Sequence, residues 1–311
     1  MAFTNSVRFG FSIFPYDRYR SVEEMVEVVR CGDRLGFEAL LLPEHLLPPE
    51  WPAAEMATKL WLDMPTVAAH FAAVTRRLKF LSGVIVLPYH HPVALAKALA
   101  TLDVVSGGRV LFGVGAGWME AEFRRLGLPF GERSAVTDEY LRAIKELWSS
   151  DTPRFDGKYI SFDDVSFYPK PVQNPHIPIF IGGTGPRPFQ RVAELGDGWF
   201  PMTASVDTIR SGVADISERM ERLGRDPSGL WVGYTGFGMG ADRQVQAMRH
   251  DAGDTIANEG PALTPADAIE RIERFREAGV TFLSVGFPWR TAGELMEQME
   301  RFAAEVMPAF A

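Results

Sequence analysis

The sequence predicts an α/β protein: a single (β/α)8 barrel, or TIM barrel, with an insertion before its fifth strand. Two observations predict this fold. Short runs rich in β-branched and aromatic residues alternate with amphipathic segments, and eight such strand–helix units can be counted along the chain. Alternation of this kind is typical of a parallel sheet, and eight units close a barrel. A length of 311 residues suits one barrel, so we expect 1–311 to form a single domain.

The first half of the chain is expected to supply four of these units. Ser21 is suited to cap the first helix, and Gly36 is suited to end it. Pro92 fits the first turn of a later helix, because its missing N–H has no partner there anyway. The strands are expected at 7–13, 39–43, 78–87 and 109–114, and the helices at 21–35, 65–75, 92–105, 119–126 and 133–148.

The alternation is interrupted before the second half begins. Segment 149–178 is polar and rich in proline, and 159–168 within it is expected to form a hairpin. We interpret 149–178 as an insertion, because no flexible linker composition surrounds it. The remaining strands are expected at 179–181, 198–202, 230–237 and 282–287, with later helices at 265–278 and 293–302.

Composition excludes several classes of partner and site. The chain has 40 acidic and 32 basic side chains, a net charge of −8, so no nucleic-acid partner is expected. Cys31 is the single cysteine, which excludes an internal disulfide and a cysteine-rich metal cage. No signal-peptide pattern and no apolar run of ~18 residues is visible, so we expect a cytoplasmic protein with no membrane partner.

The chemistry of a barrel enzyme lies at the carboxyl ends of its strands. Phe14 follows the first strand, where it would either line a pocket for a flat ring or apolar substrate or plug the core. Glu44 and His45 follow the second strand. Histidine titrates near neutral pH, so His45 is a candidate proton donor or acceptor, with a structural hydrogen-bonding role as the alternative. Gly83, before Val84, indicates a bulge or a close approach to a ligand.

Glycines follow the next two strands. Gly115 lies in a run of alternating glycines, which lets the backbone approach a cofactor. Gly182, Gly183 and Thr184 precede a helix that begins near 186, with Arg187 in its first turn. Free backbone N–H groups, a hydroxyl and a helix N-terminus together predict a phosphate cradle; a plain tight turn is the alternative.

Other motifs are absent or incomplete. The glycines at 113–117 lack the third glycine of a dinucleotide fingerprint. His90 and His91 have no further ligands at metal spacing, so no metal site is expected. No nucleophile elbow, His-Glu-x-x-His or Walker loop occurs. Trp289 follows the last strand and supplies an aromatic ring at the same rim.

The chain resembles the bacterial luciferase-like superfamily, in particular its coenzyme F420-dependent oxidoreductases. The resemblance covers nearly the whole chain and is most specific over 92–118. It is carried by Ala96-Lys97, Ala100-Thr101-Leu102-Asp103, Ser106-Gly107-Gly108-Arg109, Gly113-Val114-Gly115-Ala116-Gly117-Trp118, Glu122-Phe123, Leu126-Gly127, Ile181-Gly182-Gly183 and Gly196-Asp197-Gly198-Trp199.

The resemblance implies a flavin-type ring held over the carboxyl end of the barrel, and a homodimer. It implies a cis peptide at Gly83-Val84 that backs the ring, and a cofactor phosphate held by the segment that begins at Gly182. His45 matches a histidine near the reacting ring, commonly preceded by aspartate in the family. This chain has Glu44 there, and Glu44 is a candidate for contact with the cofactor. Trp118 stands where the sugar-phosphate dehydrogenases have a glutamate, so a sugar-phosphate substrate is not expected.

These observations lead to one preferred function and three alternatives. The preferred function is hydride transfer between F420 and a small, mainly apolar substrate, with His45 exchanging a proton and Phe14, Trp118 and Trp289 against the substrate. The first alternative is an FMN-dependent monooxygenase that uses reduced flavin and O2; either enzyme would have a flavin or F420 reductase as a partner. The others are a non-catalytic flavin-binding relative and a metal-dependent hydrolase using His90 and His91.

Overall fold

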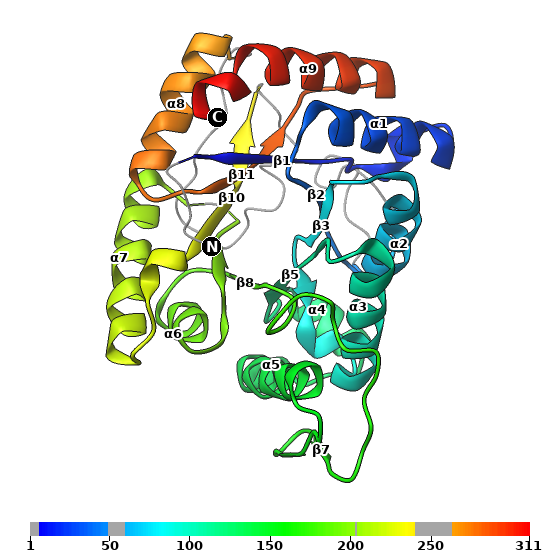
Figure 1. The fold of residues 1–311 in the computed structure, drawn as a ribbon, viewed down its shortest axis with the longest axis vertical. Coiled ribbons are helices and arrows are strands. Elements are labelled where there is room, and N and C mark those ends of the chain that lie inside the picture. The colour runs from blue at the N-terminus through cyan, green and yellow to red at the C-terminus, as the bar shows by residue number, and fades with distance from the viewer. Residues whose placement is uncertain (1–5, 49–59, 203, 240–262) are drawn as a thin grey trace.

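Parallel strands form a closed barrel in the computed structural model, which describes residues 6–48, 60–202, 204–239 and 263–311. The sheet order is β3-β2-β1-β11-β10-β9-β8-β5-β4, and a further β3–β5 pairing closes the ring (Figure 1). The strands are β1 (Arg8–Ser12), β2 (Ala39–Leu42), β3 (Lys79–Ser82), β4 (Ile85–Val86), β5 (Val110–Gly115), β8 (Ile179–Gly182), β9 (Gly198–Phe200), β10 (Trp231–Gly238) and β11 (Phe282–Gly286). The predicted (β/α)8 barrel is confirmed.

The third barrel strand is broken into two parts. A single strand was expected over 78–87, whereas β3 ends at Ser82 and β4 begins at Ile85. The peptide bond between Gly83 and Val84 is cis, as the family resemblance implied. Both parts pair with β5, so the interruption leaves the closure of the sheet intact.

Helices surround the barrel, and their caps follow the predicted signals (Figure 1). The side chain of Ser21 accepts a hydrogen bond from the backbone of Glu24, and Gly36 ends the same helix with a φ of 86°. The helices are α1 (Val22–Leu35), α2 (Met64–Val74), α3 (Pro92–Ser106), α4 (Glu120–Arg125), α5 (Arg133–Ser149), α6 (Pro186–Leu195), α7 (Val206–Arg222), α8 (Pro265–Glu277) and α9 (Ala292–Glu305).

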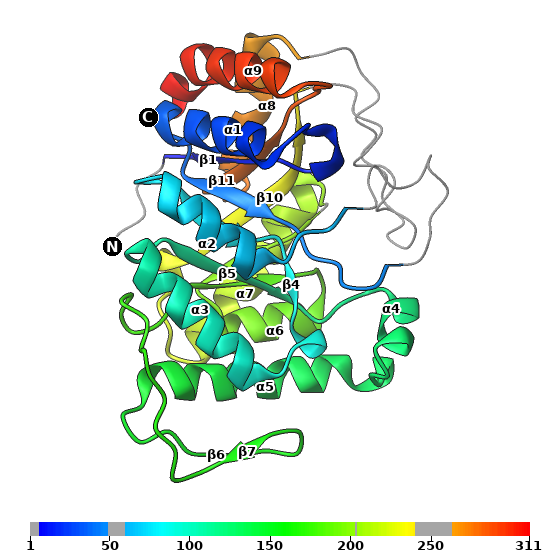
Figure 2. The same ribbon diagram turned by 90° about the vertical axis from the view of Figure 1, so that its right-hand side faces the viewer.

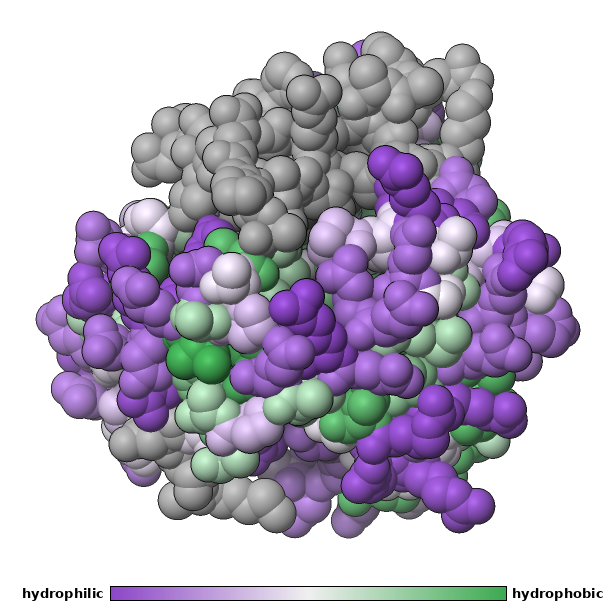
Figure 3. All heavy atoms as spheres, turned by 90° about the horizontal axis from the view of Figure 1, so that it is seen from above, coloured by the Kyte–Doolittle hydropathy of each residue, from purple (hydrophilic) through white to green (hydrophobic). Residues whose placement is uncertain are grey.

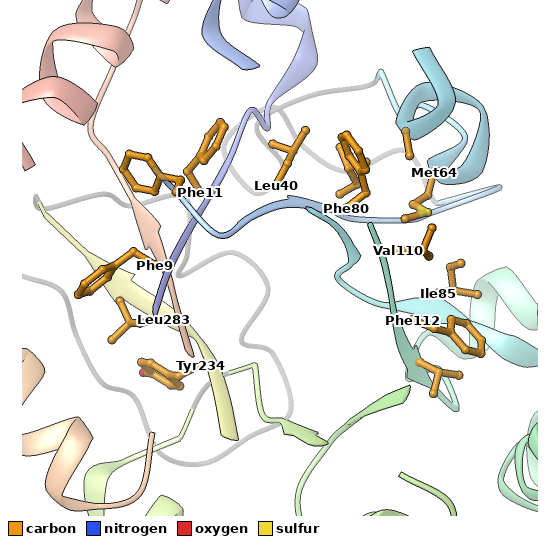
Figure 4. Packing of buried hydrophobic residues seen from close by; sticks show 14 of the residues in the cluster. Phe9, Phe11, Leu40, Met64, Phe80, Ile85, Val110, Phe112, Tyr234 and Leu283 are labelled. Atoms are coloured by element: carbon orange, nitrogen blue, oxygen red, sulfur yellow. The ribbon is translucent and has the colours of Figure 1, made fainter. Parts of the chain in front are cut away.

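Alternate residues along most of the barrel strands build two apolar layers. Leu40 and Phe80 point outward into the larger cluster between strands and helices (Figure 4). Their neighbours Leu41 and Leu81 belong to a smaller cluster inside the barrel. This alternation is expected because successive strand residues face opposite sides of a sheet. The inner cluster consists of Ala39, Leu41, Leu81, Leu111, Phe180, Phe200 and Phe282.

The segment between α5 and β8 contains a short hairpin. Its strands are β6 (Phe155–Asp156) and β7 (Ser161–Phe162), so the expected hairpin at 159–168 lies earlier than predicted. Three backbone N–H groups at the tip of the hairpin, those of Lys158, Tyr159 and Ile160, donate hydrogen bonds to the carboxylate of Glu139 on α5. These contacts fix the position of the turn. Figure 2 shows the hairpin beyond α5, at the edge of the molecule.

Asp103 of α3 ties the rest of this segment to the barrel. Its buried carboxylate accepts hydrogen bonds from the backbone N–H groups of Val172 and Gln173 at 2.9 and 3.1 Å and from the Gln173 amide at 2.7 Å. Because Asp103→Ala would leave these donors unpaired, we expect the free energy of unfolding to fall by about 3 kcal/mol in urea titrations.

Asp163→Ala is the matched control, since Asp163 is exposed in the same segment. Its free energy of unfolding should stay within about 0.5 kcal/mol of wild type. Equal loss in both variants would mean that Asp103 has no special structural role.

The face of the molecule seen in Figure 3 is mostly hydrophilic, with hydrophobic residues in small separate groups. Within the described parts of the chain, the helices are too short or too polar for any of them to span a bilayer.

Candidate active site

A cavity of about 370 Å³ lies at the carboxyl ends of the strands. This is the end of a (β/α)8 barrel at which ligands bind. Residues that follow β2, β3, β5 and β8 contribute to its wall, together with the first turns of α5 and α6. The lining residues are Pro43, Glu44, His45, Trp61, Gly83, Val84, Val86, Gly115, Ala116, Gly117, Trp118, Arg133, Ser134, Gly182, Gly183, Arg187, Pro188, Arg191, Phe200, Met202 and Thr235.

Most of the candidate residues predicted from the sequence meet in this cavity. Those that line it are Glu44, His45, Gly83, Val84, Gly115, Trp118, Gly182, Gly183 and Arg187.

Three predicted candidates lie outside the lining. Phe14 packs against Trp61, with ring centroids 4.8 Å apart, and Trp61 itself faces the cavity. Thr184 is exposed at the turn before α6. Trp289 is buried against Tyr19, with ring centroids 5.0 Å apart. Its position therefore favours packing against the segment between β1 and α1 over contact with a substrate.

His45 is paired with a carboxylate that lies far away in the sequence. Its Nδ1 is 2.8 Å from Oε2 of Glu122 on α4, and the Glu122 side chain is completely buried. The other oxygen of Glu122 accepts hydrogen bonds from the backbone N–H groups of Leu46 and Leu47 at 2.6 and 2.7 Å. One carboxylate thus holds both the imidazole and the backbone that follows it.

The surroundings of Glu122 keep it ionised. Burial would raise the pKa of Glu122, but the hydrogen bonds from His45 and from the backbone at Leu46 and Leu47 outweigh it and lower that pKa. Tyr89 donates a further hydrogen bond to Oε2 at 3.2 Å. Burial and the negative charge of Glu122 raise the pKa of Tyr89, so its phenol stays protonated and remains a donor.

Glu44 points away from its neighbour His45. Its carboxylate accepts a hydrogen bond from the backbone N–H of Val86 at 3.0 Å and lies 3.0 Å from Nε2 of His90. Glu44 therefore braces the strand after the cis peptide, although it also contributes to the cavity wall. His91 is exposed at the start of α3. Among the residues that the structure describes, no group of three or more acidic, histidine or cysteine side chains could hold a metal ion.

Glycines let the backbone pack closely around Val84. A Cβ on Gly115 would lie 2.9 Å from Cγ2 of Val84, and one on Gly182 would lie 3.4 Å from Cγ1. Gly117 has a φ of 82°, and a Cβ there would lie 2.6 Å from Val86. Side chains at these positions would push Val84 into the cavity or displace its neighbours. The glycine runs thus shape the cavity wall.

One side of the cavity is positively charged. Arg187 lies in the first turn of α6, exposed and without a carboxylate partner among the described residues. Arg133, at the start of α5, donates hydrogen bonds to the carbonyl oxygens of Gly117 and Phe130. Arg191 is buried and paired with a carboxylate at 2.5 Å. Two helix N-termini and these guanidinium groups make this side suited to an anion.

Sequence reasoning did not select Glu122, Trp61, Arg133 or Arg191. Glu122 entered only as part of a motif block, and Trp61 lies between the expected strand at 39–43 and the expected helix at 65–75. The ring centroid of Trp61 is 4.6 Å from that of His45, and the ring of Trp118 is 6.3 Å away. The expected start of a helix at 133 was the one available signal for Arg133.

Comparison with known proteins identifies the family. The family model described as Luciferase-like monooxygenase matches residues 7–259. An uncharacterized protein of Mycobacterium tuberculosis is 30% identical, over 96% of this chain and 99% of its own length. The FMNH(2)-dependent dimethylsulfone monooxygenase of Pseudomonas putida is 32% identical, over 63% of this chain and 53% of its own. The F420-dependent glucose-6-phosphate dehydrogenase of Amycolatopsis mediterranei is 29% identical, over 65% of this chain and 62% of its own length.

Solved structures share the fold along almost the whole chain. The monooxygenase RslO1 from Streptomyces bottropensis has a TM-score of 0.80 and 23% identity, over 98% of this chain and 100% of its own. An F420-dependent secondary alcohol dehydrogenase has a TM-score of 0.81 and 20% identity, over 98% of this chain and 99% of its own. Because the family model matches most of the sequence and the barrel agrees with these structures, the chain belongs to the luciferase-like monooxygenase family.

Proposed function

We propose that the protein is an F420-dependent oxidoreductase that transfers a hydride between the deazaflavin and a small, mainly apolar substrate. The observation that carries this proposal is the pairing of His45, which lines the cavity, with the buried Glu122, together with the arginines that line the same cavity. The paired histidine supports a proton exchange that accompanies hydride transfer. The basic side supports an anionic cofactor, and relatives that use F420 occur in the family.

The cavity residues suit a flat ring with an anionic tail. Gly182 and Gly183 leave the wall before α6 without side chains, so a phosphate would meet backbone N–H groups and the N-terminus of that helix. Arg187 and Arg133 would balance its charge, and Val84 would lie behind the ring. When bound, the deazaflavin supplies the hydride donor or acceptor.

The residues of the chain would bind the substrate and move one proton. Trp61, Trp118 and Met202 give the cavity apolar surfaces that exclude water and favour an apolar substrate. His45 would exchange the proton with a substrate oxygen, and Glu122 would keep its imidazole oriented.

An FMN-dependent monooxygenase is the second candidate function. The similarity to the FMNH(2)-dependent enzyme of Pseudomonas putida favours it. The same glycines and arginines would accept the phosphate of FMN, and a reductase would supply the reduced flavin. The two cofactors differ in charge, because F420 carries an anionic oligoglutamate tail. Arg187 has no carboxylate partner in the described parts of the chain, so its charge favours F420.

Titrating the purified protein separately with F420 and with FMN tests this choice. We expect quenching of cofactor fluorescence to give a micromolar Kd for F420 and much weaker binding of FMN. Arg187→Gln should weaken F420 binding about fivefold, which corresponds to ~1 kcal/mol, and the loss should shrink at high salt.

Arg222→Gln is the matched control, because Arg222 is an exposed arginine at the far end of α7. It should bind F420 as the wild type does. Micromolar binding of FMN together with no binding of F420 would instead make the protein an FMN enzyme.

A further inference from the structure

We propose that Glu122 is a positioning residue that holds the imidazole of His45 as the Nδ1–H tautomer, with the lone pair of the neutral ring on Nε2. Only the catalytic use of this tautomer rests on the proposed function. The arrangement itself is a property of the protein without its cofactor.

The two oxygens of Glu122 have separate partners. Oε1 accepts from the backbone N–H groups of Leu46 and Leu47, and Oε2 faces Nδ1 of His45 at 2.8 Å and the Tyr89 hydroxyl at 3.2 Å. The side chain is fully buried, so water does not compete for either oxygen. Every partner of this carboxylate is thus supplied by the protein.

A carboxylate only accepts hydrogen bonds, so each group that faces it must donate. The backbone contacts at Leu46 and Leu47 help to lower the pKa of Glu122, which keeps it in this accepting form. At 2.8 Å the contact with His45 is a hydrogen bond, and Nδ1 must carry its proton. The other ring nitrogen then accepts a proton, the role that a general base needs.

The separate partners of the two oxygens make glutamine an informative replacement. In Glu122→Gln the amide oxygen can remain on the N–H groups of Leu46 and Leu47, because only an acceptor is tolerated there. The amide nitrogen then faces Nδ1 of His45, while the Tyr89 hydroxyl can rotate to accept. An N–H group in this position favours the opposite tautomer, with the proton on Nε2. The substitution would therefore invert the imidazole while the backbone remains in place.

Nitrogen-15 NMR of histidine-labelled protein without cofactor tests the proposal, with the pH raised until the ring signals no longer change. His45→Gln identifies the His45 signals by their loss. We expect the wild-type signals to report a proton on Nδ1 and those of Glu122→Gln to report a proton on Nε2. Tyr89→Phe is the matched control, because it removes the other partner of Oε2 and should keep the proton on Nδ1.

A kinetic comparison adds a second readout. Glu122→Gln should lower kcat by about 10²-fold or more, the scale of acid–base catalysis, and change the KM of the substrate by less than about threefold. A protein that had merely lost packing would lose stability and KM together, without inverting the tautomer.

A wild-type His45 protonated on Nε2 would overturn the proposal, even if Glu122→Gln fails to fold. A folded Glu122→Gln variant in which His45 keeps its proton on Nδ1 would also overturn the proposal. Failure of F420 to bind would overturn the proposed function and leave the tautomer result standing, so the two failures are distinguishable.

Discussion

Replacement of His45 by glutamine is expected to lower kcat by a factor of about 10²–10⁴, the range for loss of a general acid or base. Glutamine keeps an N–H that can reach Glu122, so the buried carboxylate retains a partner, but its amide cannot exchange a proton near neutral pH. The Kd of the cofactor should change by less than about threefold. Turnover can be followed by the fluorescence of oxidised F420, with small alcohols and ketones as the first substrate panel.

His91→Gln is the matched control, because His91 is exposed at the start of α3 and is not among the residues that line the cavity. It should retain wild-type kcat and KM. Full turnover in His45→Gln with normal cofactor binding would show that the proton comes from another group.

Gly113→Ala should destabilise the barrel strongly. The new Cβ would lie 1.9 Å from the backbone oxygen of Ser82, which cannot rotate away as a side chain would. Strand β5 would have to separate from β3, and the hydrogen bond from Ser82 Oγ to the Gly113 carbonyl, now 2.8 Å, would be strained. We expect the free energy of unfolding to fall by about 3 kcal/mol, the upper part of the range for overpacking.

Gly131→Ala controls for the general effect of adding a methyl group, because a Cβ at Gly131 meets nothing within 4 Å. Urea unfolding followed by tryptophan fluorescence should place this variant within about 0.5 kcal/mol of wild type. Similar stability of the two variants would show that β5 moves away from Ser82 at little cost.

Much of the barrel could be predicted because its signals are local. Strand β5 and helix α3 begin and end within a residue or two of the positions that glycine and proline indicated. The hairpin was placed wrongly because Glu139, on a helix that precedes it, decides where the turn lies. The break between β3 and β4 coincides with the cis peptide at Gly83-Val84, which only the family resemblance implied.

The site was harder to predict because its contacts join distant parts of the chain. His45 and Gly182 were placed at strand ends by the sequence, and both line the cavity. Neither position reveals that Glu122, 77 residues beyond His45, is the partner of that imidazole. Trp289 also follows a strand, but packing against Tyr19 covers it. Strand order predicts which end of the barrel is used, whereas side-chain packing decides which residues face inward.

The loop after β2 has a consequence for altering the substrate range of the enzyme by directed evolution. Glu44 is anchored to Val86 and His90, and the next three residues are anchored to Glu122. A mutant library that randomises residues 44–47 would mostly sample misassembled proteins. Trp118 and Met202 line the same cavity yet are 43% and 38% exposed, so new substrates are more readily accommodated by varying these two positions.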